Sequence, residues 1–340
     1  LTLLVAAGVA LSQSPTGQIA FIHEVSDESR RVALLDVQTG EIHVIASGPW
    51  DGAPVWSHDG SQLAYEQTES NDSTQIRIAQ PDGSPGQPIA HEMPVNRTPA
   101  WSPDGTKLAY SASAGRATRI RVFDLATSKE SEWGKRTNAE EQKLDIAFLT
   151  PVWKSNTEIV AVGVREDKEG RTSDLYELEK EGVTPLVDTR GGGTYVEWMP
   201  ATHAPKAMLA YESNDRGDRE IFVAAPQRGV IDVSNHRAPD WNPVWSADGE
   251  WLAFESHRDG TRGIFKVRPQ QTIVTPIVAD AASDNWAPAW SSDGAWIAFV
   301  STRAGKPALY ACRADGSEAR ALTNHDGEDL APAWRPRITR

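Results

Sequence analysis

Acidic and amide side chains recur along this chain at a fixed distance from tryptophan. Seven tryptophans anchor similar segments, and in five of these segments an Asp or Asn stands five residues before the anchor. These residues are Asp51, Asn96, Asp240, Asn285 and Asp329. Phe148 and Gly193 take the same place in the other two segments. Because they precede equivalent segments, the five polar residues are expected to form a ring, and we call them the rim positions.

Aromatic residues flank three rim positions. They are Trp50, Trp241 and Trp286, and Asp284 adds a carboxylate beside the last of them. Carboxylates combined with flat aromatic rings suit an Arg or Lys side chain, a peptide amine, a sugar or a cation. Asp and Asn in a link before a strand also commonly hydrogen-bond their own backbone and shape the turn. Both interpretations stay open, a binding rim and a structural one.

Three histidines stand in the links between the repeated segments, and they are His91, His236 and His325. Imidazoles from different repeats could converge on a metal ion, and they could equally be separate surface residues. No cofactor is predicted. A cation in a central channel stays an alternative, although Ca²⁺ needs six or more oxygens and five side chains around a ring are widely spaced.

Sequence signatures of the common enzyme classes are missing. The chain has no G-x-S-x-G nucleophile elbow, no H-E-x-x-H, no phosphate-binding glycine loop and no EF-hand pattern. These absences favour a protein that is not an enzyme, without deciding the question.

The segments around the anchor tryptophans are copies of one unit. "TPAWSPDGTKLAYSA" from Thr98 returns as "APVWSHDGSQLAYEQ" from Ala53, "NPVWSADGEWLAFES" from Asn242 and "APAWSSDGAWIAFVS" from Ala287, with weaker copies from Thr150 and Tyr195. The anchors lie 44 to 52 residues apart, a period typical of a four-stranded propeller blade. They are Trp56, Trp101, Trp153, Trp198, Trp245, Trp290 and Trp334.

Each unit reads as four short antiparallel strands. The Pro-x-Trp segment is the first, and an alternating run such as "KLAYSA" is the second. Asp104 and Gly105 between them predict a tight hairpin turn. "RIRVFDL" is typical of a third strand and "ARALTN" from Ala319 of a fourth. For the Trp, Pro and Gly residues of the unit we predict a structural role.

The two ends of the chain complete one unit. "LAPAWRPR" from Leu330 is a first strand with nothing after it, and "GQIAFIHE" from Gly17 matches a second strand. The chain is therefore predicted to be an all-β, seven-bladed propeller over residues 16–340, closed by the C-terminal strand pairing with the N-terminal ones. Such closure removes the unpaired edges of an open array.

The composition of the chain bears on which classes of partner it can bind and on its location. The formal net charge of −13 argues against nucleic acid or an anionic membrane as the main partner. Cys312 is the only cysteine, so the chain can form no internal disulfide. "LTLLVAAGVALSQS" at the start is too short to span a bilayer and is typical of the end of a signal peptide or a membrane anchor. We expect residues 1–15 to be such a remnant or a tail, with membrane anchoring through the residues before Ser14; an ordinary buried segment is the alternative.

The strings "PAWSPDGTKLAYSA", "PVWSADGEWLAFESHRDG" and "PAWSSDGAWIAFVSTRAG" resemble the repeat of TolB-like β-propellers, a WD-repeat-like group frequent in bacterial envelope proteins. The resemblance covers residues 17–336. It implies a propeller in an extracytoplasmic setting, periplasmic, secreted or membrane-anchored. TolB itself resembles a six-bladed ring behind an α/β domain, so membership of the Tol-Pal system is not implied. Three residues nearly match an Arg recurring in the family, and we predict that they bind the partner: Arg216, Arg258 and Arg303.

These observations lead to one hypothesis and two alternatives. The hypothesis is a non-enzymatic binding or scaffold propeller that holds a protein or peptide partner at its channel-mouth face, in the bacterial cell envelope. One alternative is a metal-dependent lyase or hydrolase acting on a carbohydrate at the central channel. The other is an architectural module within a larger chain. A fold does not by itself supply a function.

Overall fold

The structure is a computed structural model that describes residues 14–26, 29–46, 48–70, 73–89, 92–115, 117–135, 146–167, 170–187, 201–203, 206–214, 217–225 and 229–337. All regular elements of these residues except one short turn of 3₁₀-helix are β-strands, so the all-β prediction is confirmed. No helix in the described ranges is long and apolar enough to cross a membrane. Residues 1–13, His91, Gly193, Trp198 and Arg216, named above, lie outside the described residues.

Antiparallel sheets of four strands are the repeating unit of the fold. One sheet contains β28 (Glu328–Trp334), β1 (Gln18–Ser26), β2 (Ser29–Asp36) and β3 (Ile42–Val44). A second sheet contains β12 (Ile146–Ser155), β13 (Glu158–Asp167), β14 (Gly170–Glu179) and β15 (Gly182–Val187). A third contains β16 (Ala201–His203), β17 (Met208–Ser213), β18 (Glu220–Ala225) and β19 (Gly229–Asp232). A fourth contains β20 (Asp240–Trp245), β21 (Leu252–Ser256), β22 (Gly263–Val267) and β23 (Thr275–Val278). A fifth contains β24 (Asn285–Trp290), β25 (Trp296–Ser301), β26 (Ala308–Arg313) and β27 (Arg320–Ala321).

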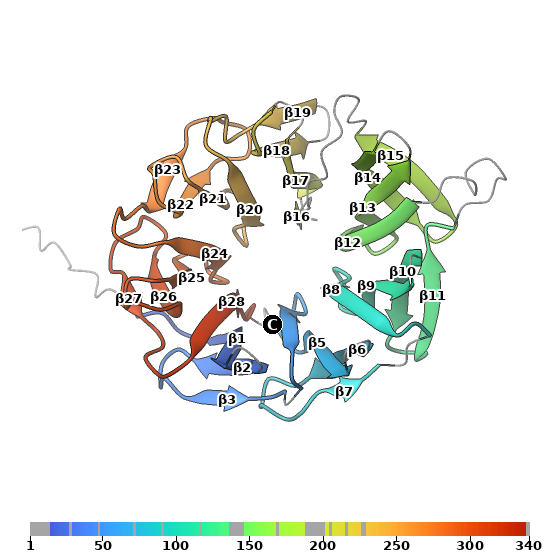
Figure 1. Cartoon of the computed structure of the whole chain (residues 1–340), viewed down its shortest axis with the longest axis horizontal. Coiled ribbons are helices and arrows are strands. Elements are labelled where there is room, and N and C mark those ends of the chain that lie inside the picture. The colour runs from blue at the N-terminus through green and yellow to red at the C-terminus, as the bar shows by residue number, and fades with distance from the viewer. Residues whose placement is uncertain are drawn as a thin grey trace, which may run out of the picture.

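One larger sheet joins two such units. The first unit contains β4 (Asp51–Trp56), β5 (Leu63–Ser70), β6 (Ser73–Ala79) and β7 (Gln87–Pro88), and the second contains β8 (Val95–Trp101), β9 (Lys107–Ala114), β10 (Ala117–Asp124) and β11 (Lys129–Trp133). A single parallel pair, Thr74 with Val95, connects them. Figure 1 shows the sheets standing around a central axis, with β8, β12, β20 and β24 close to it and β3, β11 and β23 at the periphery.

The first and last strands of the chain pair with each other. β1 and β28 are antiparallel, with Ile19 opposite Trp334 and His23 opposite Asp329. Residues more than 300 positions apart in the sequence thus become neighbours in one sheet.

Four anchor tryptophans connect a four-strand unit to the unit before it around the axis. The indole Nε1 of Trp101 donates to the carbonyl oxygen of Val55, 3.1 Å away, and Trp153 donates to Ala100 at 2.9 Å. Trp56 and Trp290 make the same bond, in each case to the residue just before the preceding anchor. All four rings are buried, so each one packs the seam between two units while its one polar atom keeps a partner. The structural role predicted for these rings agrees with this arrangement.

Asp-Gly turns join first and second strands as the sequence predicts. At Gly105 the backbone has φ of +68°, in the left-handed region that glycine adopts readily. Asp104 Oδ1 accepts hydrogen bonds from the Ser102 hydroxyl at 2.7 Å and from the Thr106 backbone N–H at 3.0 Å. The carboxylate therefore shapes the turn.

Candidate functional site

The rim positions begin the first strands of five sheets, at or next to the N-terminal residues of β4, β8, β20, β24 and β28. Their side chains are buried, with exposed fractions of 0–2%. Asp51 accepts the backbone N–H of Gly48 at 3.0 Å, and burial raises its pKa to about 6. Asn96 donates to the carbonyl oxygens of Met93 and Thr74. These side chains are therefore withdrawn from the surface that a peptide partner would contact.

Two consecutive rim positions are held by arginines. Arg258 Nη2 lies 3.1 Å from Asp240 Oδ2, its Nε donates to the Ser256 hydroxyl at 3.0 Å, and its guanidinium lies about 5 Å from the ring centroids of Phe254 and Phe265. We call Asp240, Ser256 and Arg258 the Arg corner.

The next sheet repeats this corner with an amide in place of the carboxylate. Arg303 Nη2 donates to Asn285 Oδ1 at 3.1 Å and its Nε donates to the Ser301 hydroxyl at 3.0 Å, while its guanidinium stacks over Phe299 and Tyr310. Arg258 and Arg303, both predicted to bind a partner, are thus engaged in holding the rim.

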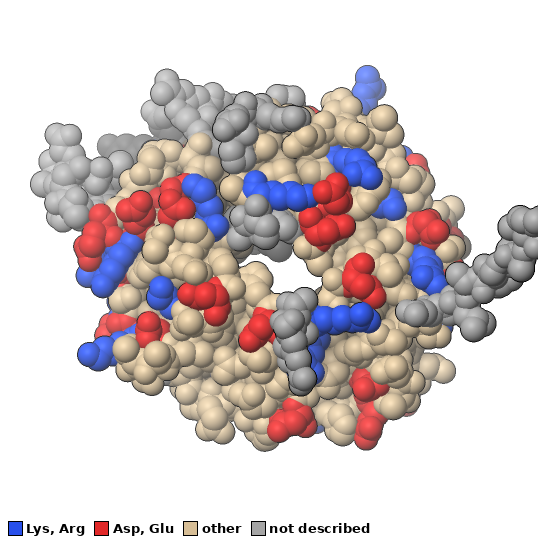
Figure 2. Space-filling model, turned by 180° about the vertical axis from the view of Figure 1, so that it is seen from behind, with Lys and Arg blue, Asp and Glu red and all other residues tan. Residues whose placement is uncertain are grey.

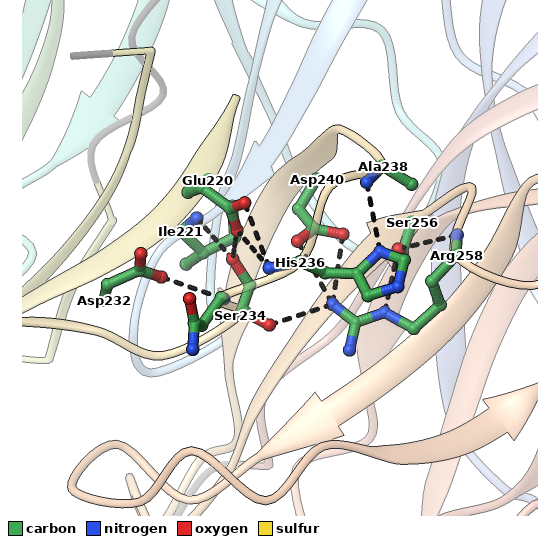
Figure 3. A network of polar contacts seen from close by, with 10 residues as sticks. Glu220, Ile221, Asp232, Ser234, His236, Ala238, Asp240, Ser256 and Arg258 are labelled. Carbon is green, nitrogen blue, oxygen red and sulfur yellow. Dashed lines mark hydrogen bonds and ion pairs between the residues drawn. The ribbon is translucent and has the colours of Figure 1, made fainter. Parts of the chain in front are cut away.

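A second buried carboxylate lies beside the Arg corner (Figure 3). Glu220 accepts the Ser234 hydroxyl at 2.5 Å and the backbone N–H of His236 at 3.0 Å. Burial and the nearby charge of Asp240 raise the pKa of Glu220 to about 7, against the lowering effect of these hydrogen bonds. Arg258 is bonded to Asp240 and to the Ser234 carbonyl oxygen. Glu220 therefore lies beside a carboxylate that already holds the arginine, and at pH 7 about half of the molecules carry a proton on Glu220.

Histidines take the place of arginine at the last rim position. Asp329 Oδ1 lies 2.9 Å from His23 Nδ1, and Asp329 Oδ2 lies 3.2 Å from His325 Nε2. We call these three residues the His corner. Within the described part of the chain this is the one group of three His, Cys, Asp or Glu residues whose ligand atoms all lie within 4.8 Å of one another.

The histidines predicted as metal candidates are not brought together in the described residues. His236 is exposed, and its Nδ1 accepts the backbone N–H of Ala238. His325 instead meets His23, which sequence reasoning did not select. The signal that could have found His23 is the pairing of β1 with β28, which sets residue 23 opposite residue 329.

The tryptophans beside the rim positions are the more accessible groups. Trp50 is 41% exposed, and the Arg30 guanidinium lies 5.0 Å from its ring centroid. Trp286 is half-buried and carries Arg262 at 5.3 Å, and Trp241 is half-buried with its ring edge-on to His257. Asp284 is exposed and accepts the backbone N–H of Arg262. Figure 2 shows acidic and basic side chains side by side around a central opening on one face of the molecule.

Comparison with known proteins identifies the fold family. Residues 199–339 match the family model of the TolB beta propeller domain. The chain has the fold of a TolB-like β-propeller. No curated protein matches it.

Solved structures share the fold of this TolB-like propeller at low sequence identity. TolB from Acinetobacter baumannii superposes with a TM-score of 0.62 at 16% identity, over 94% of this chain and 67% of that one. The β-propeller domain of the Trilobed protease from Pyrococcus furiosus, described as having an open velcro topology, gives 0.68 at 13% identity over 92% and 96%. An oligogalacturonate lyase in complex with manganese gives 0.60 at 14% over 92% and 87%.

Glutamates that the sequence analysis did not assign connect the blades of this TolB-like propeller near the rim. Thr98, Asn242 and Ala287, each just before proline, have φ between 52° and 53° in the left-handed region. Such a backbone costs about 1–2 kcal/mol for a residue other than glycine. Their N–H groups donate to Glu66, Glu212 and Glu255 of the preceding four-strand units, at 2.6, 2.6 and 2.8 Å. The recurring end of the second strand, as in "LAYE" and "LAFE", is the sequence signal for this contact.

Proposed function

We propose that this protein is a non-enzymatic binding propeller that holds a protein or peptide partner at its channel-mouth face, outside the cytoplasm in the bacterial cell envelope. We further propose a ring of seven four-stranded blades closed by β28. Five four-stranded sheets and one sheet built from two four-strand units support that blade number. The pairing of β28 with β1 supports the closure. The TolB-like fold and the apolar run at the start of the chain support the location.

One observation carries the binding proposal: Trp50 and the carboxylate of Asp284 are exposed beside rim positions whose own side chains are buried. Trp50 and Asp284 offer an aromatic face and a negative charge on a rigid frame. Rigid aromatic side chains dominate the energetics of many protein interfaces. With a net charge of −13, the protein favours a partner segment that carries Lys, Arg or a free amine.

Peptide binding tests the proposal directly. Fluorescence anisotropy would compare a short peptide rich in Arg and Lys with the same peptide carrying Gln at those positions. We expect the basic peptide to bind, more weakly as salt rises, and Trp50→Ala and Asp284→Asn to weaken it about tenfold. Ile273→Ala is the matched control, because Ile273 is 74% exposed between β22 and β23 and carries no charge. Equal binding of both peptides, or binding unchanged in both rim variants, would contradict the proposal.

A second candidate is a metal-dependent lyase or hydrolase acting on a carbohydrate at the central channel. The fold similarity to an oligogalacturonate lyase in complex with manganese favours it. Incubation of metal-loaded protein with oligogalacturonate, followed by absorbance of the unsaturated product, would test this candidate. Product formed only in the presence of metal would replace the binding proposal.

A further inference from the structure

The ring of His325 is oriented by a backbone carbonyl. Its Nδ1 lies 2.9 Å from the carbonyl oxygen of Asp326, which can only accept a hydrogen bond, so Nδ1 carries a proton. In the neutral imidazole, Nε2 then presents a lone pair. This atom is buried without a hydrogen bond, although Asp329 Oδ2 lies 3.2 Å away. A lone pair facing a carboxylate oxygen in a buried place is unfavourable, so Nε2 needs either a proton, which makes the ring an imidazolium, or a metal ion between the two atoms.

The same carboxylate faces the second imidazole with its other oxygen. His23 Nδ1 is 2.9 Å from Asp329 Oδ1, and the two imidazole rings meet edge to face with centroids 4.6 Å apart. Zinc bonds of about 2.0–2.2 Å in a tetrahedral site place neighbouring ligand atoms about 3.3 Å apart. The two nitrogen-to-oxygen distances are close to this value, so small side-chain shifts would allow all three groups to contact one ion.

The backbone around the His corner fixes its shape. Asp329 is 2% exposed and belongs to β28, while His23 belongs to the paired strand β1. Gly327, with φ of +98°, brings the loop against β1: a Cβ there would lie 2.5 Å from the Glu24 carbonyl oxygen and 2.9 Å from His23 Cε1. A metal-binding histidine usually donates its other ring N–H to a carboxylate, a backbone carbonyl or water, and His325 makes such a bond to the carbonyl oxygen of Asp326.

We propose that the His corner binds one divalent transition-metal ion of the Zn²⁺ type, through His23 Nδ1, His325 Nε2 and a carboxylate oxygen of Asp329. Two imidazoles and one carboxylate select Zn²⁺, Co²⁺ or Ni²⁺ over Mg²⁺ and Ca²⁺, which prefer all-oxygen sites. A tetrahedral ion would take its fourth ligand from solvent.

The ion would fasten the two ends of the chain. His23 and Asp329 are 306 residues apart, so a bond through metal closes nearly the whole sequence into one loop. Because metal binds the folded pair and the separated strands lack the site, Zn²⁺ would stabilise the propeller. This proposal does not depend on the identity of a peptide partner.

The test uses the full chain after treatment with a chelator, titrated calorimetrically with Zn²⁺ and followed by visible absorption with Co²⁺. We expect one equivalent to bind and to raise the midpoint of thermal unfolding. His325→Ala and His23→Ala should weaken binding by at least about tenfold to a hundredfold. His236→Ala is the matched control. His236 stands four residues before Asp240, just as His325 stands four residues before Asp329, but His236 does not belong to the His corner. Asp329→Asn, which keeps the buried shape, separates loss of a ligand from loss of fold, as judged by circular dichroism.

Several results would overturn the metal site. They are the absence of stoichiometric Zn²⁺ uptake by the unaltered protein, equal binding by the folded His325→Ala variant, and equal losses in the His236→Ala control. Equal affinity for Mg²⁺ would contradict the proposed class of ion.

Discussion

The Arg corner and the His corner solve one physical problem in two ways. Each corner has an Asp near the start of a first strand. In both, a histidine stands four residues before this Asp and an anchor tryptophan stands five residues after it. Asp240 is neutralised by Arg258, a permanent cation fixed over two aromatic rings. Asp329 has only imidazoles beside it in the corner, contributed from both ends of the chain. A buried carboxylate needs a compensating cation, and the two corners differ in whether the sequence supplies one permanently.

Removal of the permanent cation should give the largest effect. Arg258→Met leaves Asp240 and Glu220 buried without a positive charge, so we expect a loss of about 3–5 kcal/mol in the free energy of unfolding, measured with urea. Arg303→Met is the matched variant. Its partner Asn285 is neutral, so the loss there should be only about 1–3 kcal/mol. Equal losses in the two variants would mean that stacking on the aromatic rings, and not charge compensation, governs the corner.

The free energy of unfolding should depend on pH through the ionisation of Glu220, which lies beside the Arg corner. The pKa of Glu220 is about 7 in the folded protein, above its ordinary value of 4.5. The folded state therefore binds more protons than the unfolded state between these values, and stability falls as pH rises from about 4.5 to 7. We expect a fall on the order of 2 kcal/mol, followed by urea unfolding at a series of pH values.

Glu220→Gln tests that assignment. The amide cannot ionise, so the part of the fall that Glu220 causes should disappear while the hydrogen bond from Ser234 can persist. Asp51, whose pKa burial raises to about 6, should still contribute its own fall over this pH range. Asp232→Asn is the companion variant. The charge of Asp232 helps to raise the pKa of Glu220, so its removal should lower that pKa and reduce the fall without abolishing it. An unchanged pH profile in Glu220→Gln would assign the titration to another group.

Local features of the fold could be predicted from the sequence because their causes are local. The spacing of the anchor tryptophans, the alternating second strands and the Asp-Gly turn at Gly105 each depend on a few adjacent residues. The period of about 45 residues then led to a propeller, and the propeller fold is confirmed.

The site could be predicted only in part because its decisive contacts are distant in the sequence. The rim positions were found, but their burial was not predicted, nor were contacts such as the bond from the Thr98 N–H to Glu66, 32 residues away. His23 was missed because only the register of β1 against β28 sets it beside Asp329. The roles of Arg258 and Arg303 as internal partners require the same knowledge of register.

The smallest expected effect on stability comes from converting one corner into the other. In the paired registers His23 corresponds to Ser256, and Val25 corresponds to Arg258. The double substitution His23→Ser with Val25→Arg should place a permanent cation beside Asp329. Because Val25 is 53% exposed, the new side chain has room to enter. We expect the free energy of unfolding without metal to stay within about 1 kcal/mol of the parent, while Zn²⁺ no longer raises the unfolding midpoint.

The single variant His23→Ser separates the two parts of this conversion. It removes a metal ligand without adding a cation, so it should be less stable than the double variant, in urea unfolding without metal. If the double variant is instead the less stable of the two, the arginine has not reached Asp329 and the corners are not equivalent. If both variants still respond to Zn²⁺ as the parent does, the ion binds elsewhere, and the imidazoles of the His corner compensate Asp329 by holding protons.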